Sequence, residues 1–175
     1  MKNFTKLFAV LFFSIISLQI SAQKKDFSFY TKYQYRITLR WEAFADVQYR
    51  NVNYTINGFR KNPALKLANR FNFLNPKIGV SYASSNGLLG FASFSIGNKE
   101  PNRDDFEANV SQQPKPETLY DFELNTEYRK NNCSFGVTAY FMYYNNQLIL
   151  TGKVNDVGAY ARINIPKSYR AGIEL

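Results

Sequence analysis

The chain has 175 residues, a formal net charge of +9, no histidine and a single cysteine, Cys133. The lack of histidine excludes Ser-His and Cys-His catalysis and every histidine-based metal site, and one cysteine excludes an internal disulfide framework. Aromatic residues make up 17% of the chain, and thirteen residues are tyrosines. Tyrosine suits a membrane interface, because its ring is buried while its hydroxyl stays hydrated.

The first residues have the pattern of a secretory signal peptide. Lys2 and Lys6 give a positive start, an apolar run follows over 7–20, and small residues precede a predicted cleavage site after Ala22. The apolar run is too short to cross a bilayer comfortably as a helix. We therefore predict a signal peptide over 1–22 and an exported domain over 23–175; a buried N-terminal helix is the alternative.

After Ala22 the main signal is alternation of apolar and polar residues with a period of two, which indicates β-strands with one apolar face. Seven strands are predicted, over 27–37, 41–50, 77–83, 88–97, 119–129, 134–144 and 167–175. No helix is predicted outside the signal peptide. The fold class is therefore all-β.

The alternation also predicts how the fifth and sixth strands face. The residues expected on one surface are Phe122, Leu124, Phe135, Val137, Phe141 and Tyr143. Those expected on the opposite surface are Asp121, Glu123, Glu127 and Arg129. A slip of one residue in register would exchange the two surfaces.

Such strands fit either a soluble sandwich or a membrane barrel, and the connections between them favour the barrel. Short turns at 38–40, 84–87 and 130–132 alternate with long polar connections at roughly 51–75, 98–117 and 145–166. Short periplasmic turns and long extracellular loops are typical of outer-membrane barrels, whereas a sandwich has no reason to keep this order. The prediction is an antiparallel transmembrane β-barrel segment.

Several stretches resemble TonB-dependent receptors of the Bacteroidota type. They are NKEPNRDDF (98–106), PKPETLYDFEL (114–124), QLILTG (147–152), NDVGA (155–159) and IPKSYRAGIEL (165–175). The resemblance covers essentially all of 27–175 in order and spacing. It identifies residues 23–175 as a partial β-barrel of such a receptor, without a counterpart of the plug domain or of the segment that contacts TonB.

The resemblance implies an outer-membrane transporter for scarce nutrients such as ferric siderophores, and no enzyme. Related barrels have about 22 strands, so seven strands are expected to form an open curved sheet that does not transport by itself. The expected partner of the chain is outer-membrane lipid, and a nutrient ligand and TonB are expected only for a full-length receptor. The alternative is a small closed barrel with a structural or adhesin role, while a lipid-modifying barrel enzyme is disfavoured by the absence of histidine.

The candidate ligand-binding residues are Arg103, Asp104 and Asp105, because mixed charges on an extracellular loop could grip a polar or chelated solute. The alternative is a solvated loop whose charged residues pair with neighbours to fix the strand ends. Adjacent aspartates are not arranged as a facing acid–base pair, so we predict a surface loop without catalytic chemistry. Basic and aromatic residues in 51–75 suggest anionic lipid or loop packing rather than nucleic acid. No cofactor and no metal site are expected.

Overall fold

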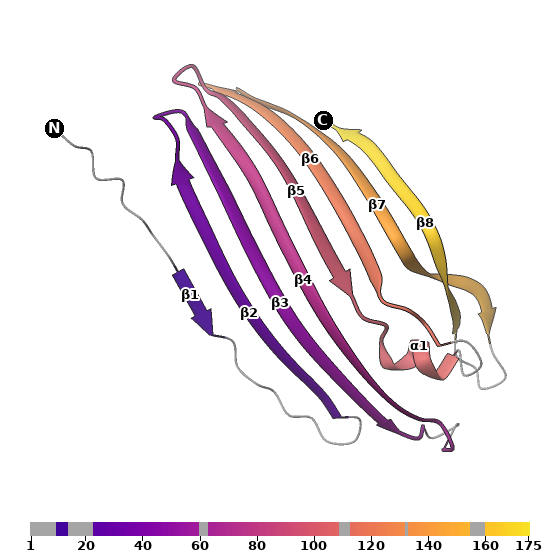
Figure 1. The fold of residues 1–175 in the computed structure, drawn as a ribbon. Coiled ribbons are helices and arrows are strands. Elements are labelled where there is room, and N and C mark those ends of the chain that lie inside the picture. Colours follow the sequence, from indigo (N-terminus) through magenta and orange to yellow (C-terminus); the bar gives the residue numbers. More distant parts are fainter. Residues whose placement is uncertain (1–9, 14–22, 60–62, 109–112, 132, 155–159) are drawn as a thin grey trace.

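The computed structural model of the chain describes residues 10–13, 23–59, 63–108, 113–131, 133–154 and 160–175. They form one curved antiparallel sheet in which strands that are consecutive in the chain are neighbours (Figure 1). The elements are β1 (Val10–Phe13), β2 (Gln23–Arg36), β3 (Trp41–Asn57), β4 (Lys66–Ala83), β5 (Leu88–Lys99), α1 (Arg103–Ala108), β6 (Glu117–Lys130), β7 (Cys133–Val154) and β8 (Tyr160–Glu174). Among the described residues β1 and β8 do not pair, so the sheet is open as predicted and no small closed barrel is formed.

The seven predicted strands correspond to β2–β8. The additional short strand β1 pairs with β2 and lies inside the segment predicted as a signal peptide. The rest of that segment, 1–9 and 14–22, lies outside the described residues. The signal peptide therefore stays a prediction, and the N-terminal residue of the exported chain would test it.

Two of the long predicted connections are wrong, because most of their residues belong to strands. Strand β3 continues to Asn57 and β4 begins at Lys66, so the connection predicted over 51–75 is confined to 58–65. Likewise, β7 extends to Val154 and β8 begins at Tyr160. The alternation with a period of two persists in these strand extensions. Polar residues occupy one of their faces, however, so the extensions have the amino-acid composition of a loop. The short and long connections still alternate between the two ends of the sheet, which we call the short-turn end and the long-connection end.

The sheet has two chemically different faces. Phe122 and Phe141 pair across β6 and β7 and define what we call the outer face. By strand register this face carries the odd-numbered residues of β2, β3, β7 and β8 and the even-numbered residues of β4, β5 and β6. The predicted facing of the fifth and sixth strands is confirmed, because Asp121, Glu123, Glu127 and Arg129 all lie on the opposite, inner face.

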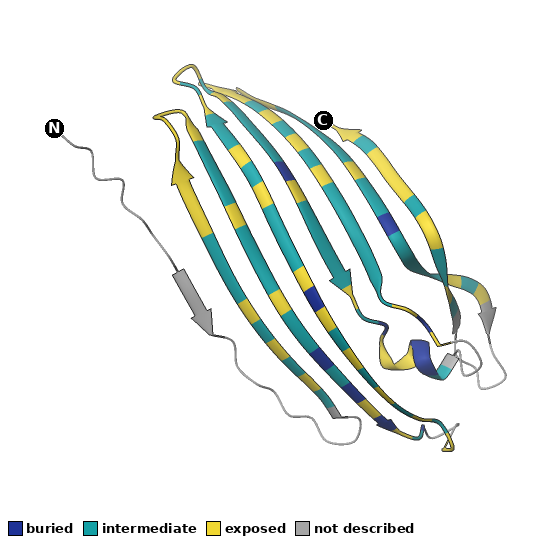
Figure 2. Cartoon of the chain, viewed as in Figure 1, coloured by how far each residue is buried: buried dark blue, intermediate teal, exposed yellow. Residues whose placement is uncertain are grey.

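Large apolar side chains are exposed mainly on the outer face. They include Phe27, Tyr33, Trp41, Ile78, Phe94, Phe122, Leu124, Phe135, Phe141 and Ile173. The buried core is small and lies instead on the inner face, toward the long-connection end, where Figure 2 shows most of the buried positions on β3, β4 and α1. Exposing so much apolar surface in water is unfavourable, so the outer face is chemically suited to an apolar environment.

The sheet splits between β4 and β5 near Pro76. Pairing between these strands ends at Lys77 and Ser95, and beyond that point β4 pairs only with β3. Proline has no amide hydrogen to donate and is tolerated where a strand loses a neighbour. Asn98 partly fills the gap, since its side chain donates to the Asn75 Oδ1 atom (2.9 Å) and to the Leu74 carbonyl (3.1 Å). The split leaves room for the segment after β5 to turn across the inner face.

The only helix among the described residues is α1, and no helix there has the length and hydropathy needed to cross a membrane. The prediction that 98–117 contains no helix is wrong. Asn102 and Asp105 form reciprocal hydrogen bonds, Asn102 N to Asp105 Oδ2 and Asp105 N to Asn102 Oδ1, each 2.8 Å long. This is a capping box with Asp at its third helical position, and the Asn-x-x-Asp spacing is a signal that the sequence analysis missed.

Candidate functional site

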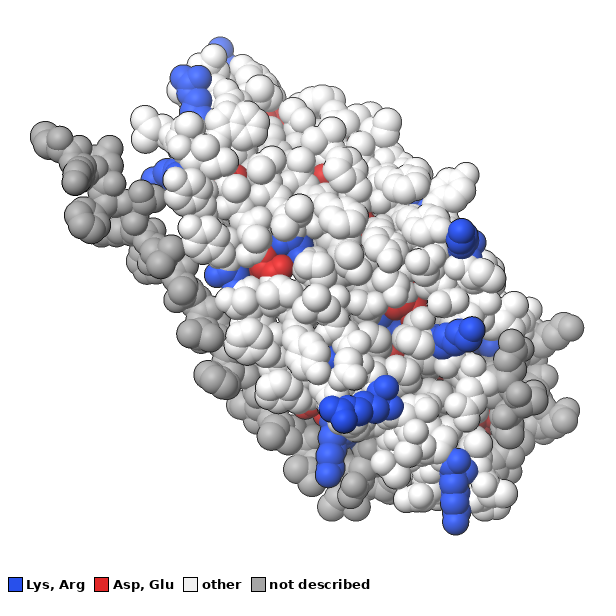
Figure 3. All heavy atoms as spheres, in the orientation of Figure 1, with Lys and Arg blue, Asp and Glu red and all other residues white. Residues whose placement is uncertain are grey.

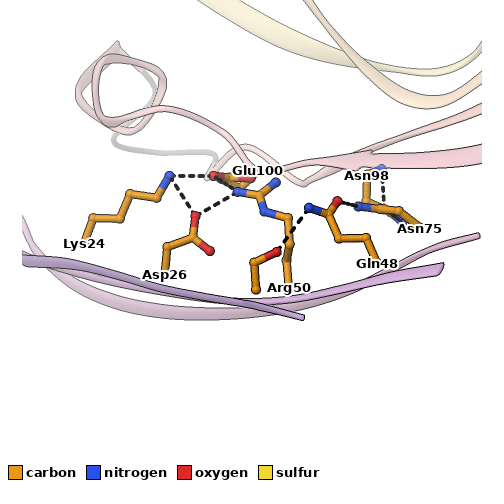
Figure 4. Close-up of polar contacts among 8 residues, drawn as sticks. Lys24, Asp26, Gln48, Arg50, Asn75, Asn98 and Glu100 are labelled. Atoms are coloured by element: carbon orange, nitrogen blue, oxygen red, sulfur yellow. Dashed lines mark hydrogen bonds and ion pairs between the residues drawn. The ribbon is translucent and has the colours of Figure 1, made fainter. Parts of the chain in front are cut away.

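The candidate site is the segment 100–108, which is fixed to the inner face at three places. The first is a group of four charged side chains that we call the anchor cluster: Lys24, Asp26, Arg50 and Glu100 (Figure 4). The Glu100 Oε1 atom lies 2.9 Å from the Lys24 Nζ atom and 3.1 Å from the Arg50 Nη2 atom. Arg50 also contacts the Asp26 Oδ2 atom at 3.0 Å. Glu100 follows β5, whereas its partners lie on β2 and β3, so the cluster ties the segment across β4.

Amide side chains extend this network across four strands. Asn75 on β4 accepts from the Asn98 backbone amide (3.0 Å) and donates to Gln48 Oε1 on β3 (3.1 Å), and Gln48 donates to Ser28 Oγ on β2 (3.1 Å) (Figure 4). A connected polar network rigidifies the structure when its members are satisfied. Strands β2 to β5, which lie under the candidate site, are therefore linked by side-chain hydrogen bonds as well as by the hydrogen bonds of the backbone.

The second attachment is apolar. Phe106 of α1 is 1% exposed and packs with Ile56 at the end of β3 and with Phe59 in the following connection. Its ring centroid lies 6.4 Å from that of Tyr54. Burial of a phenylalanine side chain contributes roughly 1.5–3 kcal/mol. This contact therefore fixes the position of α1 on the inner face.

The third attachment joins α1 to the far side of the sheet. The buried carboxylate of Asp105 lies 2.9 Å from the Arg162 Nη1 atom on β8, and 4% of the Asp105 side chain is exposed. Breaking a buried ion pair by removing one partner costs more than the pair contributes, because the remaining charge stays buried. Asp105 thus has a positioning role in α1, through both Arg162 and the capping box.

The three predicted ligand-binding residues lie together on α1 but in different environments. Arg103 and Asp104 are exposed, and the Arg103 guanidinium lies over the Phe59 ring at 4.7 Å from its centroid. Asp105 is buried. Asp105 thus pairs with a neighbour to fix the connection, as one alternative predicted, while Arg103 and Asp104 present opposite charges to solvent. Ligand binding by these residues stays a prediction.

The remaining parts of the described chain offer little reactive chemistry. No group of three or more cysteine, aspartate and glutamate side chains in the described ranges could hold a metal ion. A cavity of about 570 Å³ lies at the short-turn end, and its polar lining includes Arg36, Glu42 and Glu127. It is shallow and lies at the opposite end from α1, so it is separate from the candidate site.

The charge of Glu100 makes the attachment of the segment depend on pH. Burial acts to raise the pKa of the Glu100 carboxyl, but the hydrogen bond from Lys24 and the charges of Lys24 and Arg50 outweigh burial and lower the pKa below its ordinary value of 4.5. A carboxylate with a depressed pKa stabilises the folded form above the unfolded pKa, and this contribution is lost as the pH falls through the folded pKa.

We therefore expect the backbone amides of 102–108 to stay protected from hydrogen exchange down to about pH 4.5 and to lose protection at lower pH, after correction for the intrinsic exchange rate. The control is Glu100→Gln, which removes the ionisable carboxyl group of Glu100 and keeps a side chain of similar size. Glu100→Gln should show weaker protection at neutral pH and a flatter pH dependence. An unchanged pH profile in this variant would rule out Glu100 as the titrating group.

Comparison with known proteins agrees with this architecture. Residues 9–175 match the family model of the TonB dependent receptor-like β-barrel. No curated protein matches the chain. Similar solved structures include the copper transporter OprC, with a TM-score of 0.74 at 9% identity, and the ferric-catecholate import receptor Fiu from K12 E. coli, with a TM-score of 0.62 at 14% identity.

Both alignments cover 87% of this chain and 25% of the other chain, so the chain spans about a quarter of the length of these structures. At such low identity the likeness concerns the fold. The family is one of receptors and transporters and is not a class of enzymes. Because the family model covers nearly the whole chain, including every strand from β2 to β8, this protein belongs to the TonB-dependent receptor-like β-barrel family.

Proposed function

We propose that this chain forms part of the wall of an outer-membrane transporter for scarce nutrients, such as ferric siderophores or other metal-containing solutes. The observation that carries the proposal is the two-faced sheet. Its outer face exposes large apolar side chains over the central length of the strands, while its inner face carries charged and amide side chains. An apolar face in lipid and a polar face toward an aqueous lumen is the arrangement of outer-membrane barrels.

The cargo class is supported by the fold neighbours, which are named as a copper transporter and a ferric-catecholate import receptor. We propose Arg103 and Asp104 as the side chains that meet such a solute, since both are exposed on a helix fixed over the inner face. Asp105 would support them by holding α1. TonB and the nutrient would act on the complete receptor.

We further propose that the chain does not transport by itself. An open sheet leaves unpaired backbone groups along its edge strands, and lipid cannot satisfy them. Further strands would have to cover these edges before a closed wall could form. Solute-specific uptake by vesicles that contain only this chain would contradict this part of the proposal.

Trp41, the one tryptophan of the chain, provides a test of membrane embedding. It lies on the outer face at the start of β3, is 43% exposed, and packs against Tyr82 with ring centroids 4.9 Å apart. We expect the fluorescence of Trp41 to be strongly quenched when the full chain is refolded into vesicles of brominated phospholipid.

The matched control moves the reporter to the other face of the same strand. In the double variant Trp41→Phe with Phe44→Trp, the indole lies on the inner face and should resist brominated lipid but remain accessible to a water-soluble quencher. Equal lipid quenching of both reporters, or failure of the chain to float with the vesicles, would contradict the proposed embedding.

A further inference from the structure

The charged residues of the outer face are all basic. None of the outer-face positions on β2–β8 carries an acidic side chain, because Asp26, Asp46, Asp121, Glu123, Glu127 and the other strand acids lie on the inner face. The basic outer-face residues lie near the ends of the strands. Lys25, Lys66, Arg70 and Lys167 lie toward the long-connection end, and Lys130 lies at the short-turn end. The outer face therefore has a net positive rim, heavier at the long-connection end.

Two of these cations and an amide form one row across three neighbouring strands. Asn53 on β3 is paired with Lys25 on β2 and with Arg70 on β4. Adjacent strands lie about 4.8 Å apart, so the Cα atoms of Lys25 and Arg70 are roughly 10 Å apart with Asn53 between them. Both long side chains are exposed, and neither has an ion pair with an acidic residue in the described parts of the chain. We call Lys25, Asn53 and Arg70 the basic row.

Polar side chains next to the basic row are held in place by hydrogen bonds. Asn53 donates to Asn51 Oδ1 (2.7 Å), and Asn51 donates to Asn72 Oδ1 (2.6 Å), which also accepts from the Tyr49 hydroxyl (3.0 Å). These amides occupy the outer-face positions directly below the row. The hydrogen-bonded ladder restricts their rotamers, so a group bound by the row meets an ordered surface.

The row lies just beyond the apolar band. The outer face of β3 is apolar from Trp41 to Tyr49 and becomes polar at Asn51. Ten residues from Trp41 to Asn51 rise roughly 33 Å along the strand, which corresponds to about 25 Å of depth at the usual strand tilt, the height of the apolar band in such barrels. Figure 3 shows one face of the molecule, on which most of the surface is uncharged and Lys and Arg side chains protrude mainly near the edges, several of them at the lower end. The basic row is therefore at the depth of lipid headgroups.

We propose that the basic row binds the phosphate of a membrane lipid headgroup in the leaflet around the long-connection end. The inference rests on the proposed membrane embedding. The Arg70 guanidinium presents paired N–H donors that match phosphate oxygens, Lys25 adds a second positive charge, and Asn53 lies between them as a neutral donor or acceptor. Without an acidic side chain on this face, no internal anion competes for the two cations.

Lipid selectivity measures this binding directly. The full chain is refolded into phosphatidylcholine vesicles, and electron spin resonance gives the motionally restricted fraction of spin-labelled phosphatidic acid and of spin-labelled phosphatidylcholine. We expect a preference for phosphatidic acid. Lys25→Gln or Arg70→Gln should each lower it about fivefold, the contribution expected of one basic residue near a lipid surface, and the double variant should lower it further. Arg70→Lys should lose part of it, because the paired donors are lost.

The matched control is Lys130→Gln, which removes one positive charge from the outer face at the opposite end and should leave the preference unchanged. An equal loss in Lys130→Gln, or a preference that survives the double variant, would overturn the proposal. If millimolar inorganic phosphate displaces the labelled lipid, the basic row is a site for free phosphate, and the proposal of a lipid site is overturned. If Trp41 is quenched by brominated lipid but phosphatidic acid is not preferred, only this inference fails, whereas an unquenched Trp41 refutes the proposed function.

Discussion

Leu124→Arg is expected to reduce strongly the amount of the chain that accumulates in outer membranes. Leu124 lies near the middle of β6 on the outer face, is 47% exposed, and is paired with Ala92 and Ala139, whose small side chains cannot shield a charge. An arginine on the lipid face at mid-bilayer costs about 2–4 kcal/mol. Since each 1.4 kcal/mol is a factor of ten, the folded population relative to the unfolded one should fall by about 30-fold to 700-fold.

The adjacent residue provides the control for this experiment. Asn125→Arg introduces the same side chain on the inner face, between Glu123 and Glu127, and loses the Asn125 hydrogen bond to Thr138 Oγ1 (2.8 Å). That loss costs about 1 kcal/mol, and attraction to the two carboxylates offsets part of it. Quantitative immunoblotting of the outer-membrane fraction should therefore find much more of Asn125→Arg than of Leu124→Arg. Equal amounts would show that the outer face does not contact lipid.

The facing of the strands could be predicted from sequence because a period of two is a local property. Phe122 and Glu123 are neighbours in the chain, so their opposite faces follow from strand geometry alone. The ends of the strands could not be predicted in the same way. Around Asn51 and Asn53 the outer-face residues change from apolar to polar where the strand leaves the apolar band, and a polar strand has the composition of a loop.

The candidate site could be predicted only in part. Arg103, Asp104 and Asp105 stand out because they are contiguous charged residues in a connection, but their different exposure depends on contacts with Phe59 and Arg162, which are distant in sequence. The anchor cluster was not predicted for the same reason. Lys24 and Glu100 are 76 residues apart, and they meet because the sheet splits at Pro76, which no local pattern indicates.

The second large effect is expected at the apolar attachment of α1. Phe106→Ala removes the side chain that packs on Ile56 and Phe59, and a Phe→Ala change at a buried position costs about 3–5 kcal/mol. A helix of only six residues is not stable by itself. We therefore expect α1 to open locally while the strands keep their pairing, because the ladder from β2 to β8 does not depend on Phe106. Hydrogen exchange followed by mass spectrometry should show faster exchange in peptides that cover 101–108 and unchanged exchange in β3 and β6.

The control on the same helix is Asp104→Ala, which changes an exposed side chain. It removes a favourable charge from the first turn of α1, an effect of about 0.3–1 kcal/mol, and it introduces the residue with the highest helix propensity. Exchange in 101–108 should therefore change little. If solute binding by the complete receptor needs Arg103 on an ordered α1, Phe106→Ala should weaken binding although Phe106 does not face solvent. Binding that is unchanged in Phe106→Ala, with 101–108 shown to be open, would separate the solute site from α1.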